Sequence, residues 1–108
     1  MVVTKHDVWL IALDPTVGNE MKKTRPCLIL SPDEMNLVFS TYVVAPMTSK
    51  SKPFPFRVET TFLGKRGWIA LDQIKTVSKL RMVKRLGKVS GVTSANVNEM
   101  MKRIFIEE

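Results

Sequence analysis

The sequence predicts a small, mainly β domain that ends in one α-helix. Short runs rich in β-branched and aromatic residues recur along most of the chain, and prolines, glycines and Asp-Pro pairs separate them. The C-terminal end instead places apolar residues at helical spacing. Many short strands with closely spaced turn signals are typical of a small barrel or compact sheet.

Each expected strand ends at a turn signal. Asp14-Pro15 ends the first, Pro32-Asp33 ends the second, and Pro46 ends the third. Phe56 is expected to point inward from the fourth strand, because that strand alternates in polarity. The expected strands cover residues 7–13, 26–31, 40–45, 56–60, the WIAL run after a turn at 63–67, and a strand near 74–77, with a short turn or helix at 33–37.

The basic run at residues 79–88 is interpreted as an exposed edge protected by charge. The terminal helix follows it, with Thr93 or Ser94 as the expected N-cap. Its apolar stripe contains Val97, Met100, Met101, Ile104 and Phe105.

Composition indicates one soluble domain spanning residues 1–108. Hydrophobic residues make up 44% and charged residues 25%, and no apolar run approaches the length of a membrane span. The N-terminus lacks the pattern of a signal peptide, and the single cysteine, Cys27, is typical of a reducing cytoplasm. We therefore expect a cytoplasmic protein with no membrane association.

The charge balance points to a polyanionic partner. Seventeen lysines and arginines against ten acidic residues give a net charge of +7 and an isoelectric point near 9.9. Such an excess suits nucleic acid or an acidic protein, although it also serves solubility alone.

Few residues could carry out chemistry. There is one histidine, no zinc-ligand spacing and no glycine-rich phosphate loop, and Cys27 lies within the apolar PCLIL run. What remains is Glu20 and Arg25 on a long polar connection, with hydroxyls at Thr48 and Ser49. A carboxylate can accept the proton of a 2′-hydroxyl, and a guanidinium can stabilise charge on a phosphorane, so this set suits metal-free RNA cleavage. On spacing alone the set is a weak signal, because Glu and Arg on a polar loop usually form a solvated ion pair.

One long segment resembles a known signature. DVWLIALDPTVGNEMKKTRPCLILS is similar to the N-terminus of the MazF/PemK (Kid-type) toxins of bacterial type II toxin–antitoxin modules. VVAPMTSKSKPFPFRV, GWIALDQIKTV and a terminal helix follow in the family's order, so the resemblance spans nearly the whole chain. Its most specific element is LDPTVGNE followed by TRP.

The resemblance implies an SH3-like small β-barrel with a C-terminal α-helix that works as a homodimer. It also implies a sequence-specific endoribonuclease that needs neither metal nor cofactor. The expected substrate is single-stranded RNA, chiefly mRNA, and the products carry 2′,3′-cyclic phosphate and 5′-hydroxyl ends. A cognate antitoxin with an acidic, flexible tail is expected to occupy the RNA groove.

The resemblance assigns catalytic roles to three residues. Arg25 in TRP matches the family's catalytic arginine, Thr48 in PMTS its phosphate-contacting threonine, and Glu20 in GNE the acid assigned as base in MazF-like members.

The Kid-type branch uses a different set of residues at this site. It uses an aspartate in a DQ motif, an arginine two residues before it and a loop histidine. Asp72 matches the aspartate, but Ala70 and Asn19 stand in place of the arginine and histidine. This favours the Glu20–Arg25 arrangement and leaves Asp72 in a supporting or structural role.

Two polar loops are expected to face each other across the RNA. Their lysines would form an electrostatic track for a phosphate backbone. The expected RNA-binding residues are Asn19, Lys22, Lys23, Ser49, Lys50, Lys52 and Gln73.

Two other functions share this architecture. One is a toxin that inhibits DNA gyrase by binding it without catalysis, and the other is a non-catalytic RNA-binding barrel. Neither needs Glu20, Arg25 and Thr48 together, whereas the nuclease does.

Overall fold

A computed structural model describes residues 1–107 of the chain. Within that range, seven strands form one curled antiparallel sheet, accompanied by two α-helices and two short 3-10 turns. In chain order the elements are β1 (Asp7–Ala12), β2 (Thr24–Ile29), α1 (Asp33–Val38), β3 (Thr41–Thr48), β4 (Arg57–Phe62), β5 (Lys65–Ala70), η1 (Leu71–Gln73), β6 (Lys75–Ser78), η2 (Lys79–Arg81), β7 (Met82–Lys88) and α2 (Gly91–Phe105).

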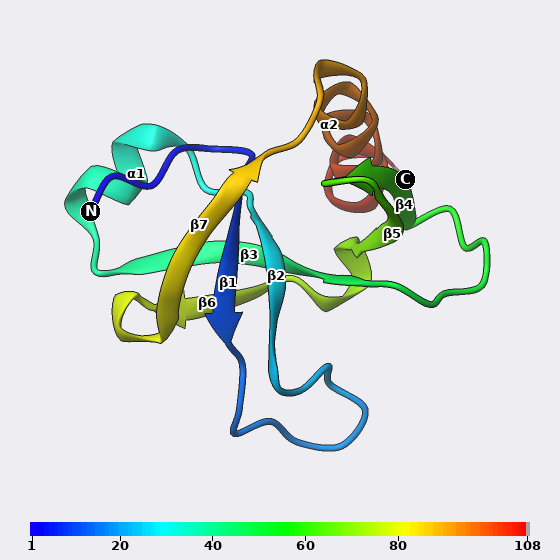
Figure 1. The fold of residues 1–108 in the computed structure, drawn as a ribbon. Helices are drawn as coiled ribbons and strands as arrows, with labels where there is room; N and C mark the ends of the chain where they lie inside the picture. Colours follow the sequence, from blue (N-terminus) through cyan, green and yellow to red (C-terminus); the bar gives the residue numbers. More distant parts are fainter. Residues whose placement is uncertain (108) are drawn as a thin grey trace.

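Strand β3 connects the different parts of the sheet, because it pairs with three other strands. The strand order is β4-β5-β3-β2-β1-β7, and β6 also pairs with β3. One end of β3 therefore pairs with β6 and the other with β5, while β2 pairs with its middle. In Figure 1, β1, β2 and β7 run side by side and cross β3 and β6, while β4 and β5 lie beneath α2. The basic segment expected as an edge is strand β7, which lies at the end of this strand order beside β1.

Alternate residues of the central strands enter two apolar clusters. Val8 and Leu28 belong to one cluster, whereas their neighbours Trp9, Cys27 and Ile29 belong to the other. This division follows from the two-residue period of a strand, because successive side chains point to opposite faces. The sheet is thus buried on both sides along its middle strands, and the loops at its ends are left to carry polar groups.

Helix α2 packs beside β4. Val97 is completely buried, and Met100 and Met101 pack against the same apolar cluster. The expected N-cap was wrong: the helix begins earlier, where the Ser90 hydroxyl accepts a hydrogen bond from the Thr93 amide at 3.2 Å. A serine three residues before the expected cap offers the same chemistry, so residue type alone does not fix where a helix starts.

Two other expectations about the strands were also wrong. Strand β3 does not stop at Pro46 but continues to Thr48, with Pro46 paired opposite Cys27. Phe56 lies outside β4, remains 36% exposed and stacks on Phe54, with ring centroids 5.2 Å apart. None of the helices formed by residues 1–107 has the length and apolar character of a membrane span.

Candidate active site

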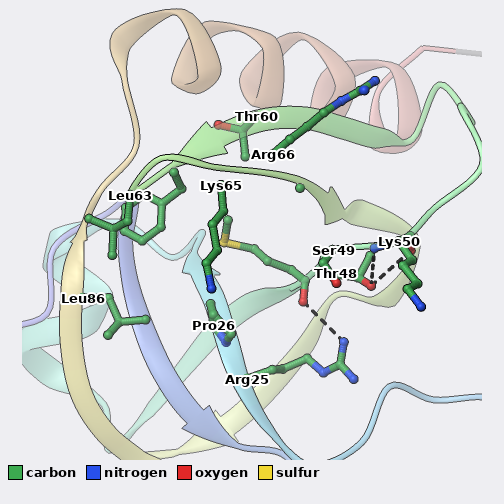
Figure 2. A pocket seen from close by; sticks show the side chains of 13 residues that line it. Arg25, Pro26, Thr48, Ser49, Lys50, Thr60, Leu63, Lys65, Arg66 and Leu86 are labelled. Carbon is green, nitrogen blue, oxygen red and sulfur yellow. Dashed lines mark hydrogen bonds between the residues drawn. The ribbon is translucent and has the colours of Figure 1, made fainter.

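The register of β2 and β3 brings Arg25 alongside Thr48. Cys27 pairs with Pro46, so two residues further along the antiparallel strands Arg25 and Thr48 come together. Both line one open cavity of about 510 Å³, and Figure 2 shows Arg25 at the bottom of it and Thr48 at the right, beside Ser49 and Lys50. Arg25 and Thr48 therefore face the same cavity, although α1 and most of β2 and β3 separate them in the sequence.

The Arg25 side chain is held mainly by neutral groups. Its Nε donates to the Lys22 carbonyl at 2.9 Å, and its Nη1 lies 3.4 Å from the Met47 carbonyl oxygen and 3.7 Å from the Met21 sulfur. Its Nη2 bonds to none of residues 1–107. The guanidinium is therefore oriented without being neutralised, and part of its donor fork stays available to an anion.

Thr48 is fixed by its own loop and by a glycine on β5. Its hydroxyl lies 3.1 Å from the Lys50 carbonyl, to which it donates, and 3.3 Å from the Lys50 amide, from which it accepts. A Cβ atom at Gly67 would stand 3.1 Å from the Thr48 carbonyl oxygen. Glycine thus allows β5 to approach β3 closely at the residue that faces the cavity.

The wall of this cavity combines cations with apolar side chains. Figure 2 shows Arg66 of β5 on the side opposite Arg25, while the Lys65 side chain extends from β5 toward Pro26. Its full lining consists of Arg25, Pro26, Met47, Thr48, Ser49, Lys50, Thr60, Phe62, Leu63, Lys65, Arg66, Gly67 and Leu86. Four of these thirteen residues are cationic and none is acidic, so the cavity suits a phosphate-bearing ligand.

Glu20 lies in a second cavity of about 490 Å³. Its carboxylate lies 3.8 Å from the Lys75 ammonium, and its side chain is 53% exposed. Neither Arg25 nor Thr48 lines this cavity, so the structure brings together two of the three expected catalytic residues and places the third in a separate cavity. The second cavity is lined by Asn19, Glu20, Met21, Pro46, Asp72, Gln73, Ile74 and Lys75.

The loop between β1 and β2 contributes Asn19, Glu20 and Met21 to the second cavity. Its base is closed by a hydrogen bond from the Leu13 amide to the Lys23 carbonyl at 3.0 Å. Further along, the Met21 amide donates to the Gln73 side-chain oxygen at 2.8 Å. The loop projects freely from the sheet in Figure 1, so Gln73 is an important anchor of its course.

The expected RNA-binding residues divide between these sites. Ser49 and Lys50 line the Arg25 cavity, whereas Asn19 and Gln73 line the Glu20 cavity. The remaining lysines, Lys22, Lys23 and Lys52, are exposed on the two loops and line neither cavity.

The sequence did not single out Lys75 or Arg57 as residues of the site. Lys75 pairs with Glu20, and Arg57 binds Asp72 in a fork. The hydrogen bond from Arg57 holds the pKa of Asp72 below its ordinary value. The only available signal for Lys75 was its place directly after the DQI segment, and for Arg57 its place at the start of a strand.

Cys27 and His6 lie away from this chemistry. Burial raises the pKa of the Cys27 thiol to about 12. His6 is buried, and its Nδ1 lies 2.9 Å from the Ser94 hydroxyl, while burial lowers its pKa. Among residues 1–107, no three His, Cys, Asp or Glu side chains gather as metal ligands.

Comparison with known proteins gives this geometry its context. Residues 4–105 match the model of the PemK-like, MazF-like toxin of type II toxin-antitoxin systems. The chain belongs to this toxin family. The endoribonuclease PemK of Escherichia coli is 34% identical over 106 residues, which cover 93% of this chain and 77% of the relative.

Solved structures of MazF toxins share the fold. The crystal structure of MazF (Form-I) from Deinococcus radiodurans matches with a TM-score of 0.86 and 25% identity over 96% of each chain. An endoribonuclease in complex with its cognate antitoxin from Mycobacterial species matches with a TM-score of 0.79 and 21% identity, over 93% of this chain and 91% of that one. The predicted small barrel with a C-terminal helix is confirmed, as is the predicted family.

Proposed function

We propose that this PemK/MazF-family toxin is an endoribonuclease that cuts single-stranded RNA, chiefly mRNA, at a short recognition sequence without a metal. One observation carries the proposal: Arg25 and Thr48 line the same cation-rich cavity in a chain of this family. The name of the PemK relative, an endoribonuclease, supports the same activity.

In the proposed reaction, the 2′-oxygen attacks the adjacent phosphorus while Glu20 accepts the 2′-hydroxyl proton. The bond from phosphorus to the 5′-oxygen breaks, and that oxygen takes up a proton from water. Glu20 then returns the proton that it accepted to the solvent, which restores its carboxylate. Arg25 stabilises the charge that develops on the phosphoryl oxygens. The Thr48 hydroxyl turns from the Lys50 carbonyl and donates its hydrogen to one of them. The products are a 2′,3′-cyclic phosphate and a 5′-hydroxyl.

The two exposed loops would guide the strand. Lysines on both loops attract the backbone, and side chains of the Glu20 cavity, among them Asn19 and Gln73, offer hydrogen-bond groups to base edges. We further propose that the toxin is a homodimer and that an antitoxin with an acidic tail competes for the cationic cavity. The mycobacterial structural neighbour, solved with its cognate antitoxin, supports such a partner.

The decisive experiment is incubation of the purified protein with a long single-stranded RNA in EDTA, followed by mapping of the ends. Discrete cuts with 5′-hydroxyl ends are expected. A substrate with 2′-deoxyribose at the cut site should remain intact, because the attacking oxygen is then missing. An Arg25→Ala protein from the same purification scheme controls for contaminating nucleases.

Strict dependence on Mg²⁺, or uncut RNA from a folded protein, would overturn the proposal. Uncut RNA bound with a steep salt dependence would identify a binding protein instead.

A further inference from the structure

An ion pair next to the Glu20 cavity has the geometry of a clamp. The Arg57 Nε lies 2.6 Å from Asp72 Oδ1, and its Nη2 lies 2.8 Å from Oδ2. Arg57 starts β4 and is paired with Ala70 of β5. The small side chain of Ala70 leaves room for Arg57 to reach Asp72, two residues further along the chain. Only 14% of the Arg57 side chain and 31% of the Asp72 side chain are exposed. Paired, partly buried forks of this kind are geometrically specific.

The clamp touches the loop that follows β3. The Arg57 Nη1 lies 3.4 Å from the Ser51 hydroxyl, and that hydroxyl donates to the Lys52 carbonyl at 2.8 Å. The Leu71 amide also donates to the Phe56 carbonyl at 3.1 Å, which joins η1 to the end of the same loop. The loop that carries Ser49, Lys50 and Lys52 is therefore attached to η1 at both places.

The other side of the clamp leads to the loop between β1 and β2. Asp72 and Gln73 are neighbours in η1, and Gln73 accepts the hydrogen bond from the Met21 amide at 2.8 Å. Met21 in turn contacts Arg25 through its sulfur, 3.7 Å from Nη1. Contacts thus run without interruption from Ser51 through Arg57, Asp72 and Gln73 to the catalytic arginine.

We propose that Arg57 and Asp72 are positioning residues that set the two RNA-binding loops, and through Met21 the Arg25 guanidinium, in register for cleavage. The inference rests on the proposed ribonuclease function. It also means that Asp72 does not act as the general base. Both carboxylate oxygens of Asp72 are occupied by Arg57, whereas Glu20 has one long contact to Lys75 and otherwise faces solvent.

A second fork, which joins β4 to β5, provides a matched control for stability and for the spectra. Arg66 of β5 binds Glu59 of β4 at 2.8 and 3.1 Å, but both side chains are more than half exposed and their fork touches neither loop. Glu59→Gln therefore breaks an ion pair of the same type without breaking the connection. A role in general stability would make the two sites respond alike.

The kinetic test compares Arg57→Met, Arg57→Lys, Asp72→Asn and, as control, Arg103→Met in single-turnover cleavage of a short RNA. Glu59→Gln is kept for stability and spectra, because its partner Arg66 lines the Arg25 cavity. Arg57→Met and Asp72→Asn are expected to lower the rate constant by about tenfold or more, because small displacements of a positioned group are costly. Arg57→Lys should recover part of that loss. Arg103→Met removes an exposed charge from the last turn of α2 and should stay within about twofold of the wild type. The rising limb of the pH–rate profile should persist in Asp72→Asn. Its disappearance would make Asp72 the base and overturn the proposal.

An amide spectrum supplies a readout that does not depend on activity. In ¹⁵N-labelled protein, Asp72→Asn should shift the Met21 and Ser51 amide resonances and leave those of the core strands in place, whereas Glu59→Gln should move neither. Unchanged Met21 and Ser51 signals together with wild-type kinetics would refute the clamp while leaving the ribonuclease intact. If the wild type cuts no RNA, the proposed function fails, yet the spectra still decide whether the clamp joins the two loops.

Discussion

Replacing Arg25 is the most direct test of the site. Two of its nitrogens are committed to the Lys22 and Met47 carbonyls, so Nη2 is the group left for a phosphoryl oxygen. Arg25→Ala removes that donor and its charge, and losing one such donor typically costs a hundredfold to a thousandfold in rate, or about 2.7–4 kcal/mol. Arg25→Lys should regain at most about tenfold, because one ammonium cannot satisfy the backbone carbonyls and also reach the phosphate.

The assay is single-turnover cleavage, in EDTA, of an oligonucleotide with one ribonucleotide step between a fluorophore and a quencher. Arg103→Ala is the matched control, since it removes the same charge from an exposed position in the last turn of α2. Circular dichroism verifies that each variant is folded. Cleavage by Arg25→Ala within about threefold of the wild type would remove this arginine from the mechanism.

Four further results are expected. Glu20→Gln should lower the cleavage rate by about a hundredfold and abolish its rise with pH, which a pH–rate profile measures. Gly67→Ala should slow cleavage by pushing on the Thr48 carbonyl, whereas an unchanged rate would show that this contact relaxes freely. Native Cys27 should resist iodoacetamide at pH 8 and react on unfolding, because its pKa is raised to about 12. Since the pKa of Asp72 is lowered by folding, its ion pair stabilises the protein above about pH 4 and loses that effect as pH falls through the lowered value. Denaturation of wild type and Asp72→Asn should thus differ by about 1 kcal/mol at neutral pH and converge in acid.

The fold was largely readable because local patterns reflect it. Short β-rich runs between turn signals located most strands, and helical spacing located α2. The end of β3 was not readable, because its pairing with β2 and β5 carries the strand past Pro46. Phe56 was expected inward from alternation that belongs to β4, but β4 begins one residue later. Pairing between strands, which the local sequence does not show, sets the end of β3 and the start of β4.

The candidate site was readable only in part for a similar reason. Residue chemistry and the family resemblance selected Arg25 and Thr48, but nothing in their spacing indicates that strand register brings them together. The contacts of Glu20 with Lys75 and of Arg57 with Asp72 join residues far apart in the chain. No local pattern encodes such pairs, so they emerge only from the folded sheet.

The separation of Glu20 from Arg25 has a chemical consequence. Had the two formed a fork like that of Arg57 with Asp72, each would have cancelled the charge that the proposed reaction requires of the other. Instead, carbonyl groups orient Arg25 and leave its charge available to phosphate, while Glu20 has one weak, solvated contact to Lys75. The saturated pair, Arg57 with Asp72, lies where rigidity between two loops is useful and free charge is not. The distribution of ion pairs therefore supports the assignment of catalytic and positioning roles independently of sequence resemblance.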